Sequence, residues 1–414
     1  MTQSRQAPET GARRFGPNHR WTVLGVGFAA QASFSAAFSG IPVIGILMRT
    51  GYHLSNNQLG FVLGCMALGV GVSEILWGLL TDKLGDRRVL LAGLLLMGSM
   101  LAIMSAFVVP TEHGAPSATV LGISFILVGA LGASVNSSSG RAIMTWFTDA
   151  RRGFAMSIRQ TAIPVGGAIG AAILPRLAQH YGFTTVYAVL ALFCLASAIA
   201  TWIWLHEAEV APAASGAVDP RSPLRRLDVW RLALASGLLT APQIAILTFA
   251  GIYLHDERQV GIATLSTTLI IVQVGGAVLR VWSGRYTDKH KNRRSVIRGI
   301  GLLAGLATLG LVFANQAPTL LVLALVSVSG ILANAWHGVA YTEIAAMAGA
   351  GRAGTAIGME GTTVFSSAFF TPLLIPLVLS ISSWNVVWGL IALASLLAVP
   401  LSPAQQEQTQ LKLA

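Results

Sequence analysis

Long apolar runs repeated along the whole sequence restrict the fold of this chain more than any other feature. A helix needs about 20 predominantly apolar residues to cross the hydrocarbon core of a bilayer. Runs of this kind cover residues 21–48, 57–80, 88–109, 118–145, 154–175, 183–205, 229–254, 261–284, 296–315, 318–346, 354–380 and 384–402. Only 10% of the residues are charged, whereas soluble globular proteins have roughly 25%. The sequence therefore predicts an all-α membrane protein with twelve transmembrane helices.

One polar segment divides the twelve runs into two sets of six. Its sequence, HEAEVAPAASGAVDPRSPLRRLD, is rich in Ala, Pro and charge and is typical of a flexible linker. No small-residue cleavage site follows a short apolar region near the start, so we expect no removable signal peptide. The expected organisation is a tail at 1–20, a six-helix bundle at 21–205, the linker at 206–228, a second six-helix bundle at 229–402 and a tail at 403–414.

Lysine and arginine residues fall mainly in alternate loops. With the N-terminus in the cytoplasm, 21 of the 27 lie on the cytoplasmic side, and Arg49, Arg176 and Arg258 lie on the other. Cytoplasmic loops of membrane proteins carry such an excess of positive charge. The pattern predicts a multi-pass protein of the cytoplasmic (inner) membrane with both termini inside. It also explains the net charge of +11 without a nucleic-acid partner.

An internal repeat relates the ends of the second and eighth apolar runs. The segments from Gly78 to Arg88 and from Gly284 to Arg294 align without a gap at an offset of 206 residues. A Gly, a Thr-Asp-Lys triplet and an Arg-Arg pair recur at the same positions in both. A repeat at half the chain length predicts two structurally similar halves.

Both segments resemble the signature G-x-x-x-D-[RK]-x-G-x-[RK]-[RK], which follows helices 2 and 8 of the major facilitator superfamily. The second copy departs from it only at the inner glycine, which is Lys291 here. The resemblance covers the span count, the linker and both signatures. It implies a secondary transporter of two pseudo-symmetric six-helix bundles, which is not an enzyme and needs no cofactor or metal.

Asp82 and Asp288 sit at the cytoplasmic ends of their helices, where the Arg and Lys residues that follow can pair with them. In that family this aspartate and its basic partners help to latch the two halves together on the cytoplasmic side. The resemblance therefore implies a latch role for Asp82, Arg87, Arg88, Asp288, Arg293 and Arg294. Glycines at the start of each signature remove side chains where another helix packs closely. The alternative is that these charges only fix the membrane topology.

Six charged residues are candidates for positions within the membrane, where a charge at mid-bilayer costs roughly 2.5–3.5 kcal/mol on insertion scales. They are Glu74, Arg141, Arg159, Arg280, Glu343 and Glu360. The repeat makes Glu74 equivalent to Arg280, and the starts of the fifth and eleventh runs make Arg159 equivalent to Glu360. Helices 2, 5, 8 and 11 thus each carry one charge near the cytoplasmic end. Arg141 is predicted to be a snorkelling or gate residue, and Glu343 to act in the gate or in proton transfer.

In the family fold, helix 2 packs on helix 11 and helix 5 packs on helix 8. This would place Glu74 near Glu360 and Arg159 near Arg280. Two adjacent carboxylates favour sharing a proton, and two arginines form a strong site for an anion. We therefore expect proton coupling at the glutamates and substrate binding at the arginines. The alternative, which does not exclude this, is that the four charges only neutralise one another as a gate.

Two segments resemble oxalate/formate-type and monocarboxylate-type members of the superfamily. They are Leu279 to Gly284, and Trp146 to Ala155 in the loop between helices 4 and 5. In those members the helix 8 arginine binds the substrate carboxylate, which implies this role for Arg280. Their acidic-aromatic motif in helix 1 is not evident in residues 21–48.

Helices 1, 4, 7 and 10 line the cavity in the family fold. The polar and aromatic residues on the matching runs are Gln31, Ser35, Phe38, Asn136, Ser137, Gln243, Tyr253, Asn334, Trp336, His337 and Tyr341. We expect substrate contacts from Gln31, Asn136, Gln243, Tyr253, Asn334, His337 and Tyr341. A simple packing role is the alternative for a lone residue such as His337. The set predicts a moderately polar cavity for a small substrate.

The sequence has no phosphate-binding loop of an ATPase and no hydrolase or metalloprotease motif. The leading hypothesis is proton-coupled transport of a small organic anion, with a carboxylate favoured, by alternating access. Proton-driven efflux of drugs or metabolites is the alternative, and Ile163 to Gly167 partly matches an efflux motif. A third hypothesis is a receptor that has this fold but does not transport. We expect a monomer whose partners are the substrate, protons and the bilayer.

Overall fold

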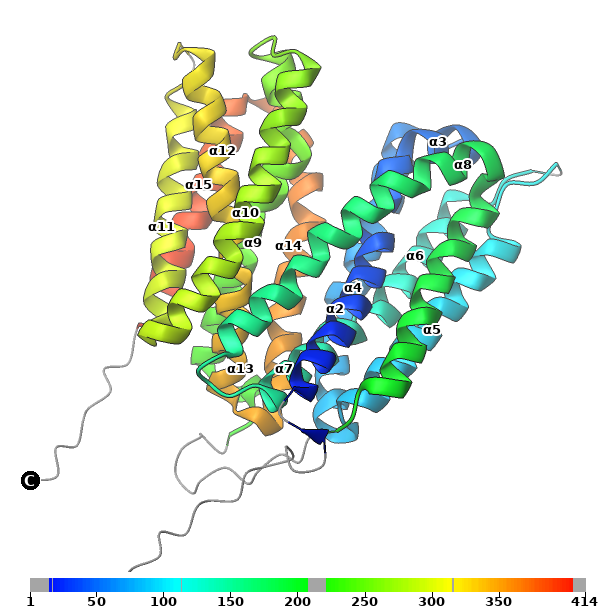
Figure 1. The fold of residues 1–414 in the computed structure, drawn as a ribbon. Helices are drawn as coiled ribbons and strands as arrows, with labels where there is room; N and C mark the ends of the chain where they lie inside the picture. The colour runs from blue at the N-terminus through cyan, green and yellow to red at the C-terminus, as the bar shows by residue number, and fades with distance from the viewer. Residues whose placement is uncertain (1–14, 17, 113, 208–220, 315, 405–414) are drawn as a thin grey trace, which may run out of the picture.

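The computed structural model describes residues 15, 16, 18–112, 114–207, 221–314 and 316–404, and over these ranges it is built from helices (Figure 1). The first half contains α2 (His19–Phe38), η1 (Ile41–Ile44), α3 (Gly45–Gly51), α4 (Asn56–Leu84), α5 (Asp86–Phe107), α6 (Ala118–Gly132), α7 (Ser134–Trp146) and α8 (Arg152–Trp204). The second half contains η2 (Pro223–Arg225), α9 (Leu227–Asp256), α10 (Ile262–His290), α11 (Arg293–Val312), α12 (Thr319–Ala335), α13 (His337–Ala348), η3 (Ala350–Arg352), α14 (Ala353–Ile381) and α15 (Trp384–Leu401).

The described part of the chain has 11 helical segments long and apolar enough to cross a membrane. The longest, α8, contains Gly182 with φ of 75°, a left-handed conformation that ends one helix and begins another. Each arm of α8 is long enough for one crossing, so α8 supplies the fifth and sixth spans. The prediction of a twelve-helix all-α membrane fold is therefore confirmed. Most of the linker and parts of both tails lie outside the described residues.

Two of the expected spans are interrupted at corresponding places in the two halves. The span expected at 118–145 breaks at Ala133 between α6 and α7. The span expected at 318–346 breaks at Trp336 between α12 and α13. The sequence repeat is thus accompanied by a structural one, in which the fourth and tenth spans each consist of two helices.

The helices form two bundles that lean apart at one end and meet at the other, near α7 and α13 (Figure 1). Helix α4 packs along α14, and α8 packs along α10. These are the pairs expected for helices 2 and 11 and helices 5 and 8. We call the interface that they form the seam, and the end where the bundles meet the closed end.

Large apolar side chains cover the outside of the bundles. Val72 is 69% exposed, Trp202 65% and Val278 65%. In water such a surface would be unfavourable, but lipid solvates it without cost. At the closed end, side chains of both halves instead share an apolar cluster that includes Met144 and Ile357.

Candidate functional site

Asp82 joins the two bundles at the closed end. Its carboxylate accepts hydrogen bonds from the backbone N–H groups of Gly354 (2.9 Å) and Thr355 (2.7 Å), at the start of α14. The Thr355 hydroxyl donates to the same carboxylate at 2.5 Å. The first N–H groups of a helix lack intrahelical partners and carry partial positive charge, so a carboxylate is favourable there.

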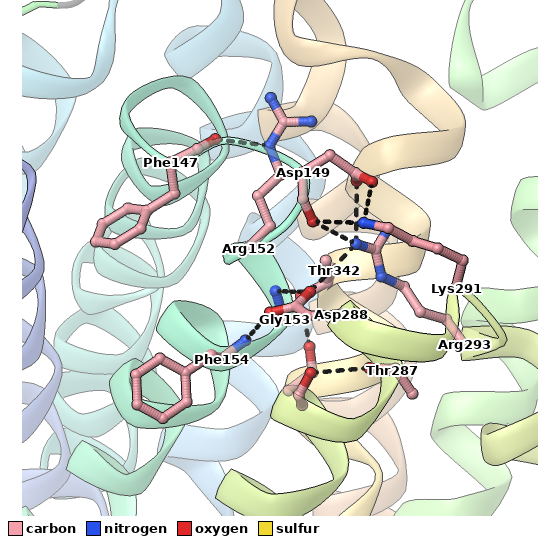
Figure 2. Close-up of polar contacts among 12 residues, drawn as sticks. Phe147, Asp149, Arg152, Gly153, Phe154, Thr287, Asp288, Lys291, Arg293 and Thr342 are labelled. Atoms are coloured by element: carbon pink, nitrogen blue, oxygen red, sulfur yellow. Dashed lines mark hydrogen bonds and ion pairs between the residues drawn. The ribbon is translucent and has the colours of Figure 1, made fainter. Parts of the chain in front are cut away.

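Asp288 makes the equivalent contact in the opposite direction (Figure 2). Its carboxylate accepts hydrogen bonds from the N–H groups of Gly153 (2.9 Å) and Phe154 (2.8 Å), at the start of α8. Each bundle's aspartate therefore binds the beginning of a helix in the other bundle. We call these two contacts, at Asp82 and at Asp288, the seam clasps.

Glycines allow the helices to approach closely beside each clasp. A Cβ on Gly78 would lie 2.4 Å from the carbonyl oxygen of Gly354. A Cβ on Gly284 would lie 2.4 Å from the carbonyl oxygen of Gly153. These distances leave no room for a side chain, so the first glycine of each repeat lies where the two bundles touch.

The expectation that the basic residues following Asp82 pair with it is wrong. Its ion-pair partner is Arg141 of α7 (3.2 Å), which also binds Asp86 (2.7 Å). Arg87 instead donates to a backbone carbonyl near the end of α8, and Arg88 is exposed.

A turn explains the difference. Gly85 adopts φ of 94° directly after α4, and α5 begins at the next residue. The backbone N–H groups of Asp86 and Arg87 then donate to Glu207, at the start of the expected linker. The chain has therefore changed direction before the arginines are reached.

In the second repeat, the basic residues do form ion pairs. Arg293 pairs with Asp288 (3.4 Å) and with Asp149 of the loop before α8 (3.0 Å). Arg294 pairs with Glu343 of α13 (2.5 Å). Glu343 thus lies near the closed end as a partner of the repeat, and its expected role in the gate or in proton transfer stays a prediction.

Asp149 connects the loop before α8 to the second bundle (Figure 2). Partial burial disfavours its ionised form, but the hydrogen bond from Lys291 and the charge of Arg293 outweigh this and lower the pKa of Asp149 to about 2. An unfolded aspartate titrates near pH 3.9, roughly. The contribution of Asp149 to stability is therefore fully present above about pH 4 and is lost as the pH falls towards about 2.

Replacing Asp149 by asparagine is expected to lower the melting temperature by a constant amount between pH 5 and 8. Below about pH 4 the wild type should lose the same contribution, so the two melting curves should converge. Thermal unfolding of the purified protein across pH measures this, with the exposed Glu112→Gln as a control in another loop. A deficit of Asp149→Asn that persists unchanged at low pH would show that the ion pairs are not its source.

Arg159 on α8 is fully buried and is hydrogen-bonded to two other helices, α2 and α7. Its Nη2 donates to Gln31 Oε1 (2.9 Å) and to both the carbonyl oxygen (2.8 Å) and Oδ1 (3.0 Å) of Asn136. Its Nε donates to the Ser139 hydroxyl (2.9 Å). Nη1 contacts only the Met156 thioether, a weak acceptor, at 3.7 Å among the described atoms. This nitrogen is therefore available to a ligand.

Glu74 on α4 is also fully buried. Its two oxygens accept hydrogen bonds from the Asn136 amide (3.1 Å) and the Ser137 hydroxyl (3.1 Å) of α7. A Cβ on Gly361 would lie 2.5 Å from the Glu74 carboxyl carbon, so α14 passes directly over this group. The positive charge of Arg159 lies within electrostatic reach.

Arg280 on α10 is 2% exposed and is bound only to neutral groups. Its Nε donates to the Asn334 carbonyl (2.8 Å) and Nη2 to Asn334 Oδ1 (3.3 Å). Its Nη1 donates to the carbonyl of Gln160 (2.8 Å), one residue beyond Arg159. Within the described part of the chain, no carboxylate forms an ion pair with Arg280.

Glu360 on α14 is the least compensated charge of the seam. One oxygen accepts a hydrogen bond from the Ser236 hydroxyl (2.8 Å). The other is buried and has no hydrogen-bond partner among the described residues. Its side chain interacts electrostatically with Glu74, so the structure brings the two glutamates together as expected.

Residues 23–369 match the family model of the Major Facilitator Superfamily. This match covers most of the chain. The chain belongs to the major facilitator superfamily. The features described above therefore belong to a member of this superfamily. They are the two bundles, the interrupted fourth and tenth spans, and the seam clasps.

Three curated relatives show the range of proteins that it resembles. The chain is 29% identical to an uncharacterized MFS-type transporter of Mycobacterium tuberculosis, over 94% of this chain and 86% of the relative. It is 24% identical to the membrane sensor protein UhpC of Salmonella typhimurium, over 70% and 69% of the two chains. It is 20% identical to the hexuronate transporter of Bacillus subtilis, over 60% and 59%.

Among solved structures, the fold is similar to that of the human organic anion transporter MFSD10. The TM-score is 0.74, with 15% sequence identity, over 93% of this chain and 99% of that one. At this level of identity, the similarity shows the superfamily fold.

Several of the expected cavity residues gather around the two buried arginines. Gln243 of α9 donates to Asn334 Oδ1 (2.9 Å). The Tyr341 hydroxyl of α13 accepts a hydrogen bond from the Asn136 amide (3.4 Å). His337 is buried and stacks on Trp336, with 3.8 Å between ring centroids. These contacts place residues of four helices beside the buried charges of the site.

Tyr253, from which we expected a substrate contact, does not join this group. Its ring packs against Trp384 and Trp388 of α15, 5.4 Å and 5.2 Å between centroids. The reason is depth along the helix. Tyr253 lies in the last turn of α9, far from Gln243, although both are on the helix expected to line the cavity.

Several buried polar atoms on the central helices have no hydrogen-bond partner among the described residues. They are Gln31 Nε2, Ser157 Oγ, Gln160 Nε2 and Oε1, Trp336 Nε1 and Glu360 Oε2. Buried polar groups are normally satisfied by protein, water or ligand. The centre of the molecule therefore has the capacity to bind a polar ligand.

Some residues of this site were not expected from sequence. Ser139 and Ser236 bind Arg159 and Glu360, and Gln160 supplies a carbonyl to Arg280. The dense run of Ser and Asn at 134–139 inside an otherwise apolar span was a usable signal for Ser139. A single Ser236 in a long helix gave none.

Proposed function

We propose that this protein transports a small organic anion, with a carboxylate as the favoured charged group, across the cytoplasmic membrane by alternating access coupled to protons. The observation that carries the proposal is the state of Arg280. The residue is 2% exposed, and the hydrogen bonds of its guanidinium go to two carbonyls and one amide oxygen. A buried charge without a counter-ion is costly, and an anionic substrate would supply one.

The surroundings of Arg280 support an anion of small size. Donors without partners among the described atoms lie nearby on Gln160 and Trp336, and Gln31 has one beside Arg159. A carboxylate accepts two parallel N–H bonds from a guanidinium. The hexuronate transporter of Bacillus subtilis and the human organic anion transporter, by their names, carry anions.

Glu360 and Glu74 are the proposed proton carriers. Glu360 has one oxygen without a described partner, and the neighbouring charge within electrostatic reach is that of another glutamate. Two adjacent carboxylates are relieved of repulsion when they share a proton. Uptake of a proton here would accompany uptake of the anion at the arginines.

The conformation fits one state of an alternating-access cycle. Both seam clasps are formed, while the bundles lean apart at the opposite end (Figure 1). Polar side chains on the outer half of α10, such as Thr264, Ser266 and Gln273, are exposed. With both termini in the cytoplasm, as we propose, the site faces outward in this state.

Uptake into proteoliposomes tests the function. We expect labelled small carboxylates to accumulate when the outside is acidic relative to the lumen, and to accumulate at least about tenfold less without a gradient. Phosphate esters, amines and neutral sugars serve as comparison substrates. Accumulation of amines or drugs when the lumen is acidic relative to the outside would favour the efflux alternative. Binding of a carboxylate without transport would favour a receptor.

A further inference from the structure

One amide joins a buried carboxylate of one helix to a buried guanidinium of another. The Asn136 Nδ2 donates to Glu74 Oε1 (3.1 Å), and Oδ1 of the same side chain accepts from Arg159 Nη2 (3.0 Å). A guanidinium can only donate, and an ionised carboxylate can only accept. The orientation of the amide is therefore dictated by its two neighbours.

The equivalent asparagine of the second half lacks this arrangement. Asn334 Oδ1 accepts hydrogen bonds from Arg280 and Gln243, but its Nδ2 donates to the carbonyl of Gly330. Both asparagines thus hold a buried arginine through their carbonyl and amide oxygens. Only Asn136 also holds a carboxylate.

We propose that Asn136 is a positioning residue that couples the ionisation of Glu74 to the anion affinity of Arg159. The inference rests on the proposed function and specifies how the proton and the anion act on each other. When Glu74 is ionised, its charge compensates Arg159 through the amide. When Glu74 takes up a proton, Arg159 loses that compensation and binds the anion more tightly.

The site can accept a proton with little rearrangement. The Ser137 hydroxyl donates to Glu74 Oε2 (3.1 Å). A hydroxyl can also accept, so it can receive a hydrogen bond from Oε2–H once that oxygen is protonated. Oε1 remains an acceptor for Asn136, while the bond from the amide loses its charge-assisted strength.

Three other charged or titratable groups face Glu74 from neighbouring elements. Arg159 comes from α8, Tyr341 from α13 and Glu360 from α14. Of these groups, only Arg159 is a cation, and Glu360 is a like charge that the first proton relieves. By linkage, the anion must strengthen proton binding as much as the proton strengthens anion binding.

Equilibrium binding to the purified full chain in lipid nanodiscs tests the coupling. The probes are labelled oxalate, glucuronate and inorganic phosphate, measured from pH 8.5 to 5.5. We expect wild-type affinity to rise at least about fivefold towards low pH, within the usual range of coupling between sites. Glu74→Gln should bind tightly at every pH. Asn136→Ala should reduce the rise to less than twofold.

Asn334→Ala is the matched control, because it removes the equivalent amide beside the other arginine. It should weaken binding but keep the wild-type rise with falling pH. Asn136→Ser, which keeps a polar group too short to bridge, replaces Asn136→Ala if the alanine variant does not fold. A wild-type pH dependence in a folded Asn136 variant would overturn the proposal.

Infrared spectroscopy separates this inference from the proposed function. The carboxyl band that disappears in Glu74→Gln reports the protonation of Glu74 without any ligand. Its titration midpoint should move in Asn136→Ala and stay in place in Asn334→Ala. Failure of all three probes to bind would count against the proposed anion transport, whereas an unmoved midpoint would refute the role of Asn136.

Discussion

Replacing Arg280 by alanine is expected to abolish measurable binding of the transported anion and its uptake. Truncating one partner of a buried, hydrogen-bonded charge pair costs roughly 2–5 kcal/mol, which corresponds to about 30-fold to several thousandfold in affinity. The expected loss is large because Arg280 is 2% exposed and no described carboxylate forms an ion pair with it. Its charge is therefore left for the substrate to compensate. Equilibrium binding and proteoliposome uptake measure the loss.

Two further variants show whether the loss is specific. Arg280→Lys keeps the charge but not the planar fork of donors, so it should retain only part of the affinity. Arg285→Ala removes an exposed guanidinium from the same helix, 5.9 Å from the Phe154 ring, and should bind as the wild type does. If Arg280→Ala binds the anion within threefold of wild type, the substrate is held elsewhere.

Replacing Gly78 by valine is expected to force the closed end of the seam apart. A Cβ at this position would meet backbone atoms of Gly354 at 2.4 Å, and backbone cannot rotate away as a side chain could. Overpacking of this kind costs typically 1–3 kcal/mol, which would shift a two-state equilibrium by about 5- to 150-fold. The state in which the seam clasps are formed should therefore become the minor one.

Distance measurements between spin labels follow this change. Labels at Arg88 and Lys289, exposed residues near the closed end of opposite bundles, should move apart in Gly78→Val. Gly60→Val is the matched control, since it places the same side chain on the same helix with no atom within 4 Å of the new Cβ. Unchanged label distances in a folded Gly78→Val protein would show that the glycine contact does not hold the seam.

The sequence predicted the fold well because membrane spans are set by length and apolarity, which are local properties. The repeat predicted the seam because Gly78 and Gly284 mark two of the sites where helices of opposite bundles touch. The interruption at Trp336 was not predicted, since a continuous apolar run does not show where its backbone bends.

The candidate site was predicted less completely than the fold. Pairing of the glutamates followed from the repeat and the family fold, and the structure brings them together. The partner of Asp82 was mistaken, because it depends on the direction of the chain after Gly85. Tyr253 was misplaced because only the helical face was considered, although the end of the run at 229–254 already placed it far from the middle of the membrane.

The seam clasps have a mechanical consequence. A rigid body tied to another at two separated points can turn only about the line through those points. The clasps lie at two different helix pairs, α4 with α14 and α8 with α10, and they bind in opposite directions. While both clasps are intact, the two halves can rotate relative to each other about this axis. They cannot rotate about any other axis or slide past each other.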